Sequence, residues 1–253
     1  MMTFGEHLEV FRRMLIRITT ATTVLAIVVF CLKDTIWKWL LAPSEWDFVT
    51  YRRIDAFLNS IGMEFHFDEY HVDLIATDLS SQFMTHITTS LYLGLLVASP
   101  YILYELFRFI SPALLENERK YSVLTLSVVY LLFASGVMMT YYILFPISFR
   151  FLGTYSVSDR IHSTITLDSY ITTFSTLTLT MGIVFQLPVI TFVLAKLKLI
   201  SSDILSRYRK HALLVIMVAA AIITPPDLMT LVLVTIPLYC LYMISIRVVK
   251  WVE

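Results

Sequence analysis

The stretch YSVLTLSVVYLLFASGVMMTYYILFPISF, from Tyr121 to Phe149, contains no charged residue. A bilayer core about 30 Å thick is crossed by about 20 apolar residues of helix, so this stretch alone is long enough to span a membrane. Its residues do not alternate between apolar and polar, as the strands of a membrane β-barrel do. The stretch therefore predicts a transmembrane helix, and it sets the fold class for the residues around it.

Further charge-free runs lie on both sides of this stretch, and together they predict six spans. The first run reaches the length of a span only if the residues just before it also contribute, which requires the Arg17 side chain to extend its charge to the interface. The fifth ends at Thr224-Pro225-Pro226-Asp227, where two prolines end the helix, so the last two helices are expected to be short. The other runs are Ile18–Leu32, Leu79–Tyr104, Ser169–Ala195, His211–Pro226 and Leu228–Ile246.

The expected fold is an all-α integral membrane protein, with residues 1–253 forming a single domain. Pro100, Pro188 and Pro237 lie inside predicted helices, and their role is taken as structural: each should kink its helix, giving a concave, cup-like bundle. Residues 34–78 (the cap segment) connect the first two spans on the outer side and carry three tryptophans typical of a membrane interface. The predicted helices span about residues 14–33, 82–107, 121–147, 168–196, 210–224 and 228–247.

The composition supports a membrane protein and excludes several other classes. Hydrophobic residues make up 58% of the chain and charged residues 15%, whereas soluble domains carry about 25% charged residues. The 19 Lys and Arg residues balance the 19 Asp and Glu residues, which argues against a basic nucleic-acid-binding protein.

The positions of the charges predict the orientation of the chain. If the N-terminus is inside, 13 of the 19 Lys and Arg residues lie on the inner side, and 12 of the 19 acidic residues lie on the outer side. Positive residues favour the cytoplasmic side of short loops. Both termini are therefore expected in the cytoplasm.

The sequence offers no chemistry typical of an enzyme. It contains no GxSxG, HExxH or glycine-rich phosphate loop, and Cys31 and Cys240 are too isolated for a metal site. No catalytic residue, metal or cofactor is expected. A small-solute transporter or channel is the alternative, but it would need polar residues at mid-membrane. Gln186 is the strongest such candidate, and it could equally bond a neighbouring helix.

Four segments resemble the TatC family, the multi-spanning core of the twin-arginine protein translocase. Residues 99–120 are similar to its second helix and first cytoplasmic loop, and residues 7–15 are similar to its opening His-Leu-x-Glu-Leu-Arg-x-Arg-Leu pattern. The segments 182–188 and 221–227, with Ile236-Pro237-Leu238, resemble its fourth helix and its last hairpin. The order of the segments and the expected number of spans agree with this family.

The resemblance implies a receptor and scaffold that binds twin-arginine signal peptides of folded precursor proteins at the cytoplasmic face. It also implies a multimeric complex in the lipid bilayer with single-helix TatA-type and TatB-type partners, with export driven by the proton-motive force. Two guanidinium groups are best bound by carboxylates, and Glu118 matches the principal acidic position of the family. Arg108 and Arg119 flank this surface, although Glu118 could also pair locally with them or with Lys120.

The N-terminal glutamate of the family falls on Val10 in this chain, so another residue would have to supply that carboxylate. Glu9 lies about 100° from this position around a helix, and Glu6 lies one turn back and about 40° away. Either Glu6 or Glu9 is therefore expected to supply the second carboxylate. Alternatively, Glu9 pairs with Arg12 and Arg13, which follow it by three and four residues.

Departures in the later segments change the contacts expected with partner helices. Gln186 stands where the family usually has Glu, and Leu231 and Met243 replace a common Gln and Glu. Thr224 is retained, and Asp227 can cap the last helix. Binding of partner helices along the last two helices is therefore expected to depend more on apolar packing.

Overall fold

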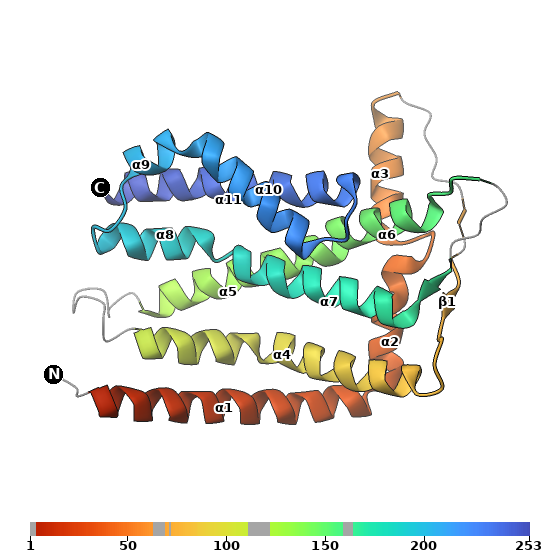
Figure 1. The fold of residues 1–253 in the computed structure, drawn as a ribbon, viewed down its shortest axis with the longest axis horizontal. Helices are drawn as coiled ribbons and strands as arrows, with labels where there is room; N and C mark the ends of the chain where they lie inside the picture. The colour runs from red at the N-terminus through yellow and green to blue at the C-terminus, as the bar shows by residue number, and fades with distance from the viewer. Residues whose placement is uncertain (1–3, 63–68, 71, 111–121, 159–163) are drawn as a thin grey trace. The chain divides into compact units, whose positions relative to one another are not determined.

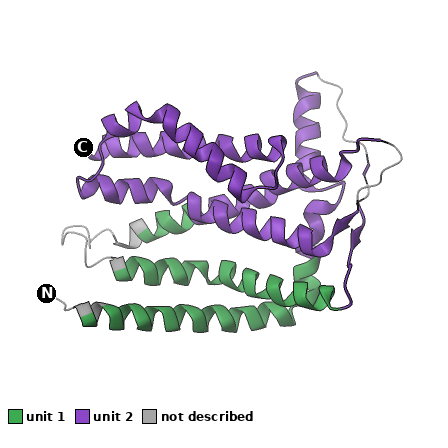
Figure 2. Cartoon of the chain, in the orientation of Figure 1, with its two compact units in different colours: residues 1–37, 80–132 green, residues 38–79, 133–253 purple. Residues whose placement is uncertain are grey.

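The computed structural model describes residues 4–62, 69–70, 72–110, 122–158 and 164–253, which fold almost entirely into helices (Figure 1). The contacts divide the chain into two compact units (Figure 2). Unit 1 contains residues 1–37 and 80–132, and unit 2 contains residues 38–79 and 133–253. The single domain expected from the sequence thus consists of two units, and each is described by itself.

Unit 1 is built on two long antiparallel helices, α1 (Phe4–Cys31) and α4 (Ser81–Ile110), which lie side by side (Figure 1). Phe11 contacts Phe109 near the start of α1, with ring centroids 5.7 Å apart, and Phe30 stacks on His86 near its end. The start of α1 and the end of α4 are therefore at the same end of unit 1.

The helix α1 begins at Phe4, ten residues before the predicted start at residue 14. The residues between these positions include Glu6, Glu9, Arg12 and Arg13, which are good helix formers. The prediction used the absence of charge to mark the helix, but a charged segment can continue a helix beyond the part that is apolar enough for lipid. For this reason the boundary was predicted too late.

The third predicted span is a compound helix rather than a regular one. The helix α5 (Ser122–Met139) continues into a π-helical turn, η4 (Thr140–Leu144), and then into α6 (Phe145–Thr154). In an α-helix the Tyr142 carbonyl would accept a hydrogen bond from the amide of residue 146, which is a proline and has none. The Thr50 hydroxyl donates to that carbonyl instead. The kink-forming prolines predicted from the sequence did not include Pro146.

The fourth predicted span, residues 168–196, is divided into α7 (Leu167–Val184) and α8 (Leu187–Lys196). Pro188 lies in the first turn of α8, where its missing amide costs no helical hydrogen bond. The prediction that Pro188 lies inside a continuous helix is therefore wrong. Pro100 and Pro237, by contrast, lie inside α4 and α11.

The last two predicted spans differ in length. The helix α10 (Arg209–Ile223) has 15 residues, whereas α11 (Leu228–Val252) has 25. The expectation of a short final helix is wrong, because α11 continues through Arg247 and Lys250, where the charge-free run has ended. Between α8 and α10 lies the short helix α9 (Ser202–Arg207).

Among the described residues, five helical segments are long and apolar enough to cross a membrane. The helix α10 is too short to be one of them, although its position matches the fifth predicted span. A sixth crossing therefore stays a prediction. The five segments are Leu8–Cys31, Ser81–Phe109, Leu126–Thr154, Leu167–Lys196 and Leu228–Val252.

The cap segment begins in α2 (Lys33–Leu41), then forms a 3₁₀ turn, η1 (Ala42–Ser44), and α3 (Val49–Ser60). Near its end, β1 (Leu74–Ile75) pairs in parallel with β2 (Ile165–Thr166), with Leu74 opposite Ile165.

Tyrosine hydroxyls attach the part of the cap segment in unit 2 to the helices of that unit. Tyr141 donates to the carbonyl of Trp39 (2.8 Å), and Tyr170 donates to the carbonyl of Leu40 (2.9 Å). In the opposite direction, Tyr51 donates from α3 to the carbonyl of Pro146 (2.7 Å). These bonds satisfy buried polar groups in an otherwise aromatic core, as buried hydroxyls require.

Candidate functional site

The end of unit 1 that holds the start of α1 and the end of α4 carries several of the predicted binding residues. Glu9, on α1, accepts hydrogen bonds through Oε1 from Arg12 (2.9 Å) and Arg13 (3.0 Å). The local pairing considered in the sequence analysis is therefore present. It does not bury the carboxylate, whose side chain keeps 39% of its surface exposed.

The remaining candidates at this end are only partly covered by the structure. Arg108 lies in the last turn of α4 and is exposed, a position where a positive charge interacts favourably with the helix dipole. Glu6 lies on α1, but its side chain is outside the described part of the chain, and so are Glu118 and Arg119. Val10 is exposed, with 42% of its surface accessible.

A buried carboxylate on α4 was missed by the sequence analysis. The Glu105 side chain is 5% exposed. Its Oε1 accepts hydrogen bonds from Tyr101 Oη (3.1 Å) and from Arg17 Nη1 on α1 (3.5 Å). Glu105 is the only acidic residue between Ser81 and Ile110. A lone carboxylate in an apolar helix is expected to face a partner, so the sequence did contain the signal.

The intramembrane candidate Gln186 lies at the break between α7 and α8. It occupies the N-cap position of α8, and its Nε2 donates to the carbonyl of Gly182 at 3.5 Å. Its backbone carbonyl accepts from the amides of Val189 and Ile190. These local contacts give Gln186 a role at the helix break.

The turn between α10 and α11 contains the other two candidates. Thr224 is buried and donates its hydroxyl to the carbonyl of Ala220 (2.9 Å). Asp227 caps α11 by accepting from the amide of Thr230 (2.7 Å), so the predicted cap is present. Both residues therefore stabilise the turn, where the structure brings them together.

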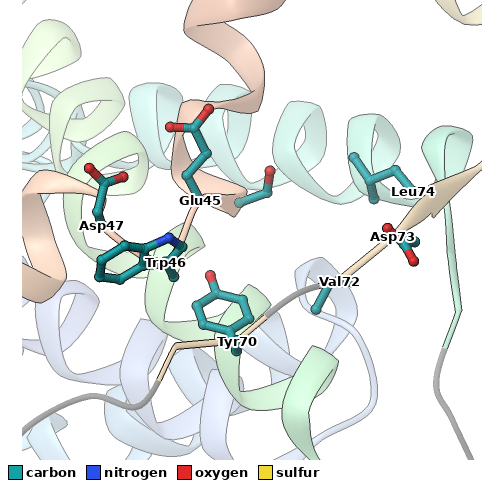
Figure 3. A pocket seen from close by; sticks show the side chains of 8 residues that line it. Glu45, Trp46, Asp47, Tyr70, Val72, Asp73 and Leu74 are labelled. Carbon is teal, nitrogen blue, oxygen red and sulfur yellow. The ribbon is translucent and has the colours of Figure 1, made fainter.

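A pocket of about 480 Å³ lies within the cap segment (Figure 3). Its carboxylates, Glu45, Asp47 and Asp73, come from two stretches of the segment, and the rings of Trp46 and Tyr70 also line it. Such a combination could attract a cation. Among the described residues, however, no group of three or more His, Cys, Asp or Glu side chains is arranged to hold a metal ion.

Tyr70, which lines this pocket, also packs against a positive side chain and a second tyrosine. The Arg150 guanidinium lies over the Tyr70 ring at 4.6 Å and over the Tyr51 ring at 5.1 Å. Tyr70 donates its hydroxyl to that of Tyr51 (3.2 Å). Burial raises the pKa of both tyrosines above the ordinary value of 10.0, so both phenols stay protonated and can serve as hydrogen-bond donors at neutral pH.

Comparison with known proteins extends these observations to the whole chain. Residues 6–237 match the family model described as Sec-independent protein translocase protein (TatC). A relative of the same description from Blattabacterium sp. is 34% identical over 256 residues, covering 100% of this chain and 96% of the relative. A second relative, from Carboxydothermus hydrogenoformans, is 32% identical to this chain, and the match covers 100% of this chain and 94% of the relative.

A solved structure agrees with these relatives. The crystal structure of the twin-arginine translocase receptor TatC superposes on this chain with a TM-score of 0.76 at 31% identity, covering 97% of this chain and 99% of that one. The family consists of multi-pass, non-catalytic transport proteins, consistent with the apolar helices described above. The chain belongs to the TatC family and is a membrane component of the twin-arginine protein translocase.

Proposed function

We propose that this chain is the signal-peptide receptor and scaffold of its translocase. It binds twin-arginine signal peptides at its cytoplasmic face and takes part in exporting folded proteins across the cytoplasmic membrane, driven by the proton-motive force. The observation that carries the proposal is the placement of Glu9 and Arg108 at one end of unit 1, where α1 begins and α4 ends. Glu118 and Arg119 follow the end of α4 by eight and nine residues in the sequence.

The chemistry of this end suits a pair of arginines. A guanidinium group donates in a planar fork that a carboxylate accepts at two points, whereas an ammonium group acts as a point charge. Glu118 is proposed as the principal carboxylate, with Glu6 or Glu9 as the second. Glu9 remains exposed beside Arg12 and Arg13, so an incoming arginine would compete with them at the surface rather than in the core.

Single-helix partners of the TatA type, and of the TatB type where present, are proposed to dock along α10 and α11. The outward side of these helices is apolar: Leu214, Val215 and Ile222 on α10 and Leu228 on α11 are all more than 60% exposed. Thr224 and Asp227 are engaged within the turn. Apolar packing therefore supplies the contact. Crosslinks to partner helices at positions 212–240 are expected, and crosslinks found only elsewhere would contradict this docking.

Direct binding tests the receptor function. The full chain in lipid nanodiscs is titrated with a fluorescent twin-arginine signal peptide and with its Lys-Lys variant. The wild type should bind the arginine peptide more tightly, and Glu118→Ala should weaken that binding by roughly tenfold, the loss of one charge-assisted contact. Equal affinity for the two peptides would overturn the proposed function.

A further inference from the structure

The carboxylate of Glu105 has a setting unlike that of any other acidic side chain in the described part of unit 1. It is 5% exposed, and its two donors, Arg17 and Tyr101, both approach Oε1. Among the described residues, no side chain donates to the other oxygen, Oε2. A buried carboxylate needs a partner charge and several hydrogen bonds to offset its desolvation, and Glu105 keeps the capacity to accept more.

Arg17 holds this carboxylate only loosely. Its Nη1 lies 3.5 Å from Oε1, whereas strong charge-assisted hydrogen bonds measure about 2.7–2.9 Å and often come in pairs from a single guanidinium. The Arg17 side chain is itself 50% exposed. Arg17 is therefore held at one point only, and the pair does not use the two-point geometry of which both groups are capable.

The position of Glu105 joins it to the proposed signal-peptide surface. Glu105 precedes Phe109 by four residues, one turn of α4, and Phe109 contacts Phe11 of α1. Glu9 lies two residues before Phe11, and Arg108 lies in the last turn of α4. On α4, Glu105 lies about one turn deeper than Arg108, and on α1, Arg17 lies about two turns deeper than Glu9. The pair is therefore near the same end of the two helices.

We propose that Glu105 is a guanidinium-binding subsite, which Arg17 occupies in the unbound protein and leaves when an arginine of the signal peptide enters. This inference rests on the proposed function and names a further residue for it. The exchange leaves the buried carboxylate paired throughout, as burial requires. The incoming guanidinium gains a second hydrogen bond, and Arg17, already half exposed, returns to water. A lysine of the peptide gains no two-point contact, so the subsite favours arginine.

Opposite effects of substitutions at the two partners test the inference. Peptide affinity is measured on the full chain in nanodiscs for Glu105→Gln, Arg17→Gln and Arg17→Lys. Glu105→Gln should weaken binding by roughly tenfold or more, because the charge-assisted contact is lost. Arg17→Gln should strengthen binding, since the occupant is removed, and Arg17→Lys should strengthen it less. Asp203→Asn and Arg207→Gln, exposed on α9, are matched controls and should leave the affinity unchanged.

Each other outcome decides against the inference. If Arg17→Gln weakens binding or leaves it unchanged, the pair is only a polar link between α1 and α4. If Arg17→Gln does not accumulate in the membrane, the change in affinity of Arg17→Lys decides in its place. Unchanged affinity in Glu105→Gln also overturns the subsite. If the wild type prefers the arginine peptide but these variants do not show the expected changes in affinity, the subsite is refuted and the proposed function stands. Failure of the inference and failure of the proposed function are therefore distinguishable.

Discussion

At the scale of single residues, a glycine makes room for a close helix crossing in unit 1. A Cβ atom built at Gly94 of α4 would lie 2.7 Å from both the Cα and the backbone nitrogen of Ala26 on α1. Real Cβ atoms do not approach backbone atoms so closely, so the two helices can pack at this distance only with glycine at position 94. Small residues at such crossings are typical of helix packing in membranes.

Gly94→Ala should therefore lower the stability of unit 1. The new methyl group would force α1 and α4 apart, and overpacking of this kind costs about 1–3 kcal/mol. Thermal unfolding of the purified protein in detergent measures the effect. Gly5→Ala is the matched control on α1, because nothing lies within 4 Å of its added Cβ. A Gly94→Ala protein that melts with the wild type would show that the helices do not depend on this contact.

Individual residues were predicted well where the interaction is local in sequence. The cap formed by Asp227 and the pairing of Glu9 with Arg12 and Arg13 involve residues three or four positions apart, which helix geometry brings together. The pairing of Arg17 with Glu105 joins residues 88 positions apart. It depends on the register of α1 against α4, which is set by side-chain packing and could not be derived from periodicity.

At the scale of elements, the π-helical turn η4 shows how the cap segment and a membrane helix depend on each other. Pro146 supplies no amide to the Tyr142 carbonyl, and Thr50, in the first turn of α3, donates its hydroxyl there. A side chain of the cap segment thus takes over a hydrogen bond that the helix itself does not make. Such turns frequently occur at functional positions in helices.

Thr50→Val should destabilise the attachment of α3 by about 1 kcal/mol, the net contribution of one hydrogen bond at a part-buried carbonyl. Chemical unfolding of the purified chain measures it. In a Pro146→Ala background the amide of residue 146 can bond Tyr142, so Thr50→Val should cost less there, which a double-mutant cycle detects. Thr20→Val on the exposed side of α1 is the control. Equal costs in both backgrounds would refute the coupling.

The ends and breaks of elements were the least predictable features of the fold. The charge-free runs located the five segments that are apolar enough to cross a membrane. However, α1 starts earlier and α11 ends later than predicted, because charged residues also form helices. The break at Gln186 and the π-helical turn depend on how prolines are accommodated by neighbouring segments. The positions of Pro188 and Pro146 in the sequence could not show that one lies at a helix break and the other follows a π-helical turn.

At the scale of the whole molecule, the family and the helical membrane fold followed from motifs and charge-free runs, and both are confirmed. The orientation, the sixth span and the cup-like shape stay predictions. The charge asymmetry supports the predicted orientation: if the termini are inside, 13 of the 19 Lys and Arg residues lie on the inner side.

Cysteine labelling in intact cells tests the orientation. In a chain whose Cys31 and Cys240 are replaced by alanine, Arg53→Cys in α3 should react with a membrane-impermeant maleimide added outside spheroplasts. Lys250→Cys, near the end of α11, should react only after the membrane is permeabilised. Both residues are exposed, so a lack of labelling would not reflect burial in the protein. The reverse pattern would place the termini outside.

The tyrosine anchors of the cap segment have a consequence for ionic strength. Tyr51, Tyr141 and Tyr170 donate neutral hydroxyls to backbone carbonyls, and no net charge takes part in these bonds. Exposed ion pairs such as that of Glu9 with Arg12 are screened as salt rises, with a Debye length of about 3 Å at 1 M. Concentrated salt should therefore loosen the charged surface of unit 1 while leaving the cap segment attached.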